Sequence, residues 1–116
     1  MKNTNIINRK RHCFDKEYSI GISNAVESFI SLNKLTYILD IITAAQYLKK
    51  VKETKLQVWK ITRRKEKGYF DVGCYTPENK RLFSVMSFQD YNKDSINLIV
   101  EDGIVLLESE IISISV

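Results

Sequence analysis

Hydrophobic and polar residues alternate with a period of two along much of the second half of the chain, a pattern typical of β-strands. Residues 96–101 follow it, and Asp102-Gly103 separates them from the apolar run 104–107. This dipeptide predicts a tight hairpin turn, because Asp and Gly accept the positive φ angles that such a turn needs. The run 104–107 is apolar on both faces, so we expect a central strand covered on both sides. The alternation returns over 112–116, which predicts one more strand.

Three further stretches of this half have the same period: 56–63, 69–76 and 82–88. A basic turn at 63–68 and a turn with a proline at 77–80 separate them, so we expect antiparallel neighbours joined by short connections. The pattern also occurs over 14–22, where two interpretations stay open. This segment is either an edge strand or a stretch laid across the sheet.

Residues 23–52 instead carry apolar residues at helical spacing. The longer of two stripes consists of Ile38, Ile41, Ile42, Ala45 and Leu48. Asn24, with Glu27 three residues later, predicts the start of the first helix. Asn33-Lys34 interrupts the pattern, so we expect two helices, or one helix bent near Asn33. Lysines 49, 50 and 52 then lie at the C-terminal end of the second helix, where positive charge offsets the helix dipole.

Together these elements predict one α+β domain over residues 1–116. A polar, basic segment (1–21) comes first, a helical segment (23–52) follows, and an antiparallel sheet of about five to six short strands (56–116) completes it. We expect the helices to cover one face of this sheet. The short strands also leave open a sheet that curls into a small, partly open barrel. The residues predicted to be buried are Ile42, Val72, Leu98, Leu106 and Ile114.

A chain of 116 residues buries about two-thirds of its unfolded surface, so it needs neither a disulfide nor a metal ion to fold. No apolar run reaches the roughly 18 residues of a membrane span, and no apolar core follows the charged N-terminal residues. We therefore expect no membrane association and a cytoplasmic location. Cys13 and Cys74 match no ligand motif; reduced thiols are the simplest interpretation, and a disulfide between them stays open.

Residues that carry catalysis are sparse in this sequence. His12 is the only histidine, no G-x-S-x-G motif is present, and the four glycines are not clustered into a phosphate-binding loop. A catalytic triad needs a base beside its nucleophile, and a zinc site needs three or four spaced ligands. We therefore predict that the protein is not an enzyme and uses no metal or cofactor.

The net charge of +4 is unevenly distributed. Residues 1–67 contain 15 Lys and Arg against 6 Asp and Glu, a charge of +9, whereas residues 68–116 contain 3 against 8, a charge of −5. Such asymmetry indicates an acidic partner, or a salt-sensitive homodimer that joins the two halves, as the alternative to a monomer. The candidate binding residues are Arg63, Arg64, Lys65 and Lys67 in the turn, Lys49, Lys50 and Lys52 before it, and the aromatic Trp59, Tyr69 and Tyr75.

Two functional hypotheses follow. The favoured one is a small, non-enzymatic intracellular protein that binds the acidic surface of another protein, with an inhibitor or immunity-type protein that neutralises a larger effector or toxin as its narrower form. The alternative is a nucleic-acid-binding regulatory domain that uses the basic helix end and the turn at 63–67, with aromatic rings to stack on bases.

Overall fold

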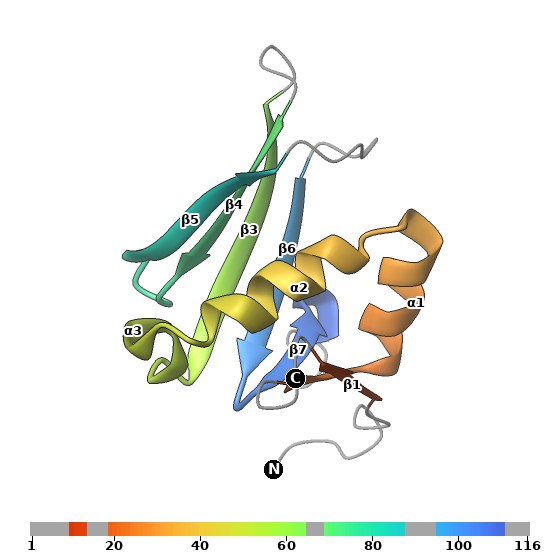
Figure 1. Ribbon diagram of the computed structural model, residues 1–116, viewed down its shortest axis with the longest axis horizontal. Helices are drawn as coiled ribbons and strands as arrows, with labels where there is room; N and C mark the ends of the chain where they lie inside the picture. The colour runs from red at the N-terminus through yellow and green to blue at the C-terminus, as the bar shows by residue number, and fades with distance from the viewer. Residues whose placement is uncertain (1–9, 14–18, 65–68, 88–94, 111–116) are drawn as a thin grey trace.

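Three helices lie on one face of a twisted β-sheet (Figure 1). The computed structural model describes residues 10–13, 19–64, 69–87 and 95–110, with the backbone alone for 10–13 and Ser19. The helices are α1 (Asn24–Asn33), α2 (Thr36–Ala45) and α3 (Lys49–Lys52). The predicted α+β class, with helices that precede the sheet, is confirmed.

Within the described residues, the sheet has seven strands in the order β1-β2-β7-β6-β3-β4-β5. Their bounds are β1 Lys10–Cys13, β2 Ser19–Ile22, β3 Leu56–Arg64, β4 Tyr69–Tyr75, β5 Arg81–Ser87, β6 Ser95–Glu101 and β7 Ile104–Leu107. The five strands from β3 to β7 pair antiparallel with one another, as predicted. The sheet does not close on itself, because β1 and β5 are its two edges in the described part of the chain. The small barrel considered as an alternative is therefore not formed.

The hairpin between β6 and β7 turns at Asp102-Gly103, which confirms the prediction. Both residues have positive φ angles, 50° and 77°, as a two-residue turn requires. Glu101 pairs with Ile104 across it, and the Asp102 amide donates to the Lys55 carbonyl at 3.0 Å. The strand expected over 112–116 lies outside the described residues.

The helical segment is divided at Lys34, so the interpretation as two helices is confirmed. Lys34 adopts a left-handed conformation (φ 57°) that ends α1, and the buried Leu35 begins the approach to α2. The N-cap of α1 is Ser23 rather than Asn24, because the Ser23 hydroxyl accepts a hydrogen bond from the Val26 amide at 3.1 Å.

The second helix ends earlier than its apolar stripe predicts. We expected it to continue to the lysines around position 50, but α2 ends at Ala45 and the three lysines lie on the separate, short α3. After Ala45 the backbone leaves the α-helical pattern, because the amides of Tyr47 and Leu48 donate to carbonyls only three residues back, at 3.1 and 3.0 Å. The side-chain amide of Gln46 forms a reciprocal pair with that of Gln57 on β3, at 3.0 Å in each direction.

The N-terminal residues form an inner strand of the sheet, which the sequence does not predict. Of the two interpretations of residues 14–22, β2 confirms a strand, but it lies between β1 and β7 rather than at an edge. Its pairing with β7 is parallel, which makes the sheet mixed. Beyond the strand, Ser23 donates its hydroxyl proton to the Glu110 carboxylate at 2.7 Å, and that carboxylate also accepts from the Leu107 amide.

One hydrophobic core lies between the helices and the facing side of the sheet. It combines Val26, Ile30, Ile38, Ile42 and Val51 from the helices with Trp59, Ile61, Val72, Leu98, Val100 and Val105 from the strands. The burial expected for Ile42, Val72, Leu98 and Leu106 is confirmed, whereas Ile114 lies outside the described residues. Leu106 is buried on the other face of the sheet, where it pairs with Ile99.

Cys74 is a free thiol in this core. Burial raises the pKa of the Cys74 thiol to about 12, and only the thiolate is nucleophilic. In a Cys13→Ser variant, we therefore expect a disulfide reagent at pH 8 to label Cys74 rapidly in denaturant and at least about a hundredfold more slowly in the folded protein. Equal rates in the two states would contradict the burial of this thiol.

The same pKa shift predicts how stability depends on pH. The folded state retains the Cys74 proton where the unfolded state loses it, so stability is full below the ordinary thiol pKa of about 8.5 and declines as the pH rises toward 12. Denaturation of the Cys13→Ser protein at pH 8 and at pH 10 measures this decline.

Candidate binding surface

Trp59 is not available for binding. Its side chain is 0% exposed, its indole N–H donates to the Gln57 side-chain oxygen at 3.0 Å, and its ring packs on Phe83 with 5.9 Å between ring centres. The expectation that Trp59 offers a stacking face is therefore wrong. Trp59 is buried because side chains alternate along β3, which turns residues 57, 59 and 61 toward the helices.

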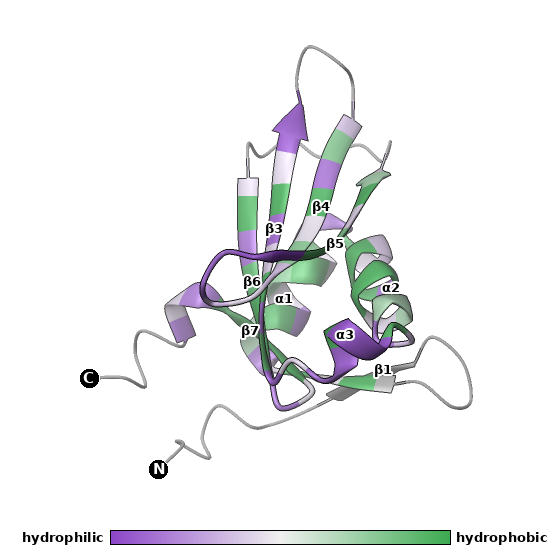
Figure 2. Cartoon of the chain, turned by 90° about the vertical axis from the view of Figure 1, so that its left-hand side faces the viewer, coloured by the Kyte–Doolittle hydropathy of each residue, from purple (hydrophilic) through white to green (hydrophobic). Residues whose placement is uncertain are grey.

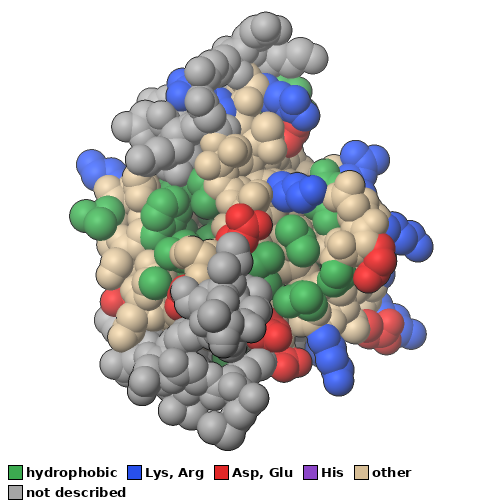
Figure 3. Space-filling view, turned by 180° about the vertical axis from the view of Figure 1, so that it is seen from behind, with side chains coloured by type: hydrophobic (Ala, Val, Ile, Leu, Met, Phe, Trp, Pro, Cys, Tyr) green, Lys and Arg blue, Asp and Glu red, His purple; other side chains and the backbone are tan. Residues whose placement is uncertain are grey.

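The face of β3, β4 and β5 that points away from the helices is the main candidate binding surface. None of the three helices lies on this side, because all of them contribute to the core on the other face. Figure 3, which views the molecule from behind Figure 1, shows hydrophobic side chains among polar and charged ones here. We call this surface the open face and define it by Lys60, Arg64, Tyr69, Asp71, Tyr75 and Met86, which the strand registers place on one side.

The Tyr75 ring lies over Gly73 on the open face. Gly73 makes this possible, since a Cβ atom at position 73 would come within 2.8 Å of the Tyr75 ring. The Lys60 ammonium sits 4.8 Å from the centre of the same ring, a cation–π distance. The ammonium also donates to the Asn79 side-chain oxygen at 2.8 Å. Tyr75 and Lys60 are thus held in place before any partner binds.

The far end of the open face carries an ion pair. The Arg64 guanidinium donates through Nε to the Asp71 carboxylate at 2.6 Å, and this contact raises the pKa of Arg64 above its ordinary value. Tyr69 pairs with Arg64 across the two strands. Arg63 pairs with the buried Phe70 and so lies on the other face of the sheet. The two arginines of the predicted basic turn therefore point in opposite directions, while Lys65 and Lys67 lie outside the described residues.

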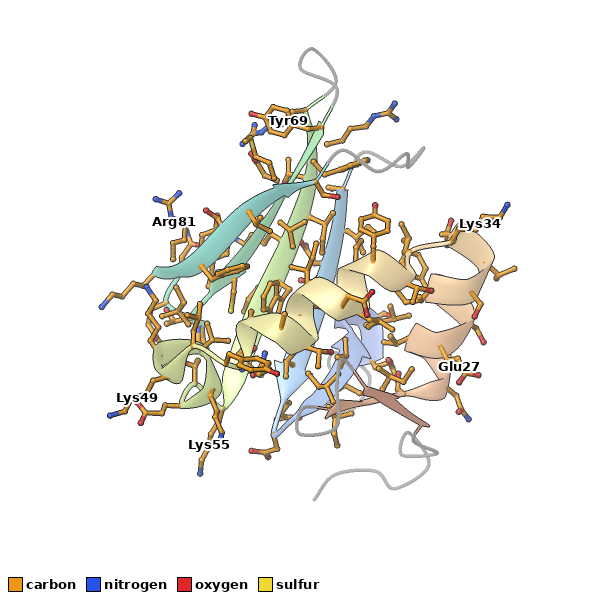
Figure 4. All side chains as sticks on the ribbon, in the orientation of Figure 1. Glu27, Lys34, Lys49, Lys55, Tyr69 and Arg81 are labelled. Carbon is orange, nitrogen blue, oxygen red and sulfur yellow. The ribbon has the colours of Figure 1, made fainter. Side chains whose placement is uncertain are left out.

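The predicted basic residues do not form one patch. Lys49, Lys50 and Lys52 on α3 precede β3, whereas Arg63 and Arg64 end it. β3 spans nine residues, so its two ends lie roughly 26 Å apart at about 3.3 Å per step. In Figure 2 the hydrophilic α3 and the hydrophilic end of β3 lie at opposite ends of the molecule. Figure 4 shows the same separation between Lys49 and Tyr69.

Three further features concern metal binding, membrane-spanning helices and a buried hydroxyl group. Among the described side chains, no three His, Cys, Asp or Glu residues come together in an arrangement that could hold a metal ion. No helix in the described ranges is long and apolar enough to cross a membrane. The Tyr37 hydroxyl oxygen is buried without a hydrogen-bond partner, and burial raises the pKa of this side chain.

The sequence model of one protein family, described as "Family of unknown function (DUF6876)", matches residues 3–111. The chain belongs to this family. No match was found to a curated protein, and none to a solved structure. The residues matched in this DUF6876 protein include every helix and strand of the described structure.

The sequence of this DUF6876 protein indicated Tyr69, Tyr75 and Arg64 of the open face. It did not indicate Lys60, Asp71, Gly73 or Met86. The alternation in residues 69–75 does separate Tyr69, Asp71, Gly73 and Tyr75 from the buried Phe70, Val72 and Cys74. The missing information was the register between β3 and β4, which brings Lys60 opposite Gly73 and beside the Tyr75 ring.

Proposed function

We propose that this chain is a non-enzymatic binding protein that uses the open face to bind an acidic surface of another protein. The observation that supports this most is the Tyr75 ring held over Gly73 with Lys60 against it. Tyrosine is a frequent anchor of protein interfaces, because a rigid ring buries a large area at a small cost in conformational entropy.

The charges of the open face favour an acidic partner. Among the described residues, no carboxylate pairs with Lys60; the Tyr75 ring and the Asn79 side-chain oxygen hold it instead. Arg81 and Lys80 are exposed next to Tyr75, which pairs with Arg81. Asp71 is occupied by Arg64. Binding of an acidic surface would therefore add complementary charge with little repulsion.

The nucleic-acid alternative receives less support. A protein that follows a phosphate backbone presents a continuous basic stripe, often with exposed aromatic rings beside it. Here the lysines of α3 and the arginines of β3 lie at opposite ends of a strand, Arg64 is paired with Asp71, and Trp59 is buried. These features favour a compact protein interface.

The proposal includes a narrower role, that of an inhibitor or immunity-type protein that neutralises a larger effector or toxin. A small domain with a preformed binding surface can act by covering a functional site of its partner. We also propose a cytoplasmic location, for which the free Cys74 thiol is suitable because cytosolic thiols stay reduced.

Capture from a source-cell lysate tests the surface. We expect wild-type protein to retain a stoichiometric protein partner after nuclease treatment, and Lys60→Glu combined with Tyr75→Ala to reduce retention at least about tenfold, since anchor residues contribute about 2 kcal/mol or more. Lys52→Glu combined with Tyr47→Ala is the matched control on the helix side and should bind normally. Assays of the captured partner, with and without wild-type protein, then test inhibition.

A gentler variant probes the position of the ring alone. Gly73→Ala forces the Tyr75 ring to move, because the new Cβ would otherwise lie 2.8 Å from it, yet it changes no charge. We expect weaker capture with an unchanged melting temperature. Retention that disappears after nuclease treatment, or that survives both open-face variants while the helix-side control loses it, would refute the proposal.

A further inference from the structure

The edge strand β5 differs from the other edge of the sheet. It spans seven residues, whereas β1 spans four, and within the described residues only β4 pairs with it. The outer side of an edge strand presents unpaired backbone N–H and C=O groups that can extend the sheet into another chain. A long edge strand therefore requires either protection or a partner.

Little on β5 protects it by charge. Its only charged residue is Arg81 at the start, and it contains no proline. Val85 is 38% exposed and Met86 is 55% exposed, on opposite faces of the strand. Lysine, proline or a bulge commonly protects an edge strand, and of these β5 has only a bulge, near its start. The central part of β5 has instead the uncharged, apolar character of a paired strand.

A bulge restricts the usable part of the strand. The register with β4 moves from Cys74↔Phe83 to Tyr75↔Arg81, so Leu82 is an extra residue, and both Leu82 and Phe83 pack toward the core. A bulge bends a strand and interrupts regular pairing. The regular segment is therefore Phe83–Ser87, with Val85 at its centre.

We propose that β5 pairs antiparallel with β5 of a second copy of this chain, about a two-fold axis at Val85. This pairing places Val85 opposite its own counterpart, Ser84 opposite Met86, and Phe83 opposite Ser87. Cross-strand pairs of β-branched residues are stabilising, and like charges opposite each other are destabilising. The segment is free of charge, so self-pairing meets no such repulsion, and the two-fold contact closes after two copies.

The contact is small, so the dimer is weak and forms reversibly. Five paired residues on each side bury less than the roughly 1,200 Å² of a typical specific interface. We therefore expect association in the range of about 10–500 µM, visible by sedimentation. Two chains of net charge +4 repel each other, so added salt leaves the dimer unchanged or strengthens it. A dimer that joined the basic and acidic halves would instead weaken with salt.

Charge placed on the axis tests the geometry. In Val85→Lys, and equally in Val85→Glu, like charges meet across the axis, and we expect about tenfold or more weaker dimerisation of each variant alone. An equimolar mixture of the two should restore dimers, since opposite charges then meet. Val85→Thr keeps the β-branch without charge and should dimerise like wild type. Leu32→Lys, at an 83% exposed position on α1, is the matched control and should also do so.

Circular dichroism melting confirms that each variant is folded before its association is measured. The expected result is a wild-type dimer, monomeric single variants and a dimeric mixture, with no loss at high salt. A wild-type protein that stays monomeric up to about 500 µM would overturn the proposal. So would a mixture that stays monomeric, or folded Val85 variants that dimerise as well as wild type.

Discussion

Replacement of Trp59 by alanine is expected to lower the free energy of unfolding by about 3–5 kcal/mol. Trp59 is the largest fully buried side chain, and its ring packs on Phe83 between β3 and the helices. The truncated residue leaves a cavity that close-packed neighbours cannot fill, and the Gln57 oxygen loses its indole donor. Denaturant titration followed by circular dichroism measures the change.

Two comparisons make the Trp59 result specific. Trp59→Phe keeps one aromatic ring but removes the N–H donor and part of the buried volume, so we expect a smaller loss, of about 1–3 kcal/mol. Leu32→Ala, at an exposed position, should change stability by less than about 0.5 kcal/mol. A Trp59→Ala protein as stable as wild type would mean that this ring is outside the core.

Replacement of Gln57 by alanine is expected to cost about 3 kcal/mol, more than is usual for an uncharged polar residue. The Gln57 amide nitrogen donates to the Val51 carbonyl at 2.9 Å and to the Gln46 side-chain oxygen at 3.0 Å, and its oxygen accepts from Trp59. Gln57 is 2% exposed, so water cannot easily replace these bonds. Its loss leaves several polar groups unpaired at the junction of α2, α3 and β3.

Chemical denaturation of a small series tests this junction. Gln57→Glu keeps the size and the acceptor for Trp59 but removes the N–H donors, so it should also be strongly destabilising. Gln46→Ala should cost less, because that side chain is only partly buried. A loss below about 1 kcal/mol in Gln57→Ala would show that the junction does not depend on this side chain.

Local signals account for the parts of the fold that the sequence predicted correctly. The Asp102-Gly103 turn, the break between α1 and α2 and the alternation of β3 and β4 each depend on residues that are close in sequence. The contact between Gln46, just after α2, and Gln57 on β3 could not be predicted in this way, because it joins two different elements. The parallel pairing of β2 with β7 joins segments more than 80 residues apart, beyond any local pattern.

Local sequence signals also predicted the candidate binding surface only in part. The basic residues 63–67 predicted a single charged binding site, yet Arg63 and Arg64 lie on opposite faces of the sheet. The alternation of β3 could have placed Trp59 with Ile61 in the core, but nearby lysines favoured an exposed ring. The contact between Lys60 and Tyr75 depends on strand register and is visible only in three dimensions.

The parallel pairing of β2 with β7 also has a consequence for the order of folding. β3, β4 and β5 follow one another in the chain and can pair as soon as they are synthesised, whereas β2 leaves the ribosome early and must wait for β7. Until then, one side of β2 has no neighbour, and the hydroxyl of Ser23 lacks the Glu110 carboxylate. We therefore expect the docking of β2 to be a late step on the folding path, since closure of a long loop delays non-local contacts.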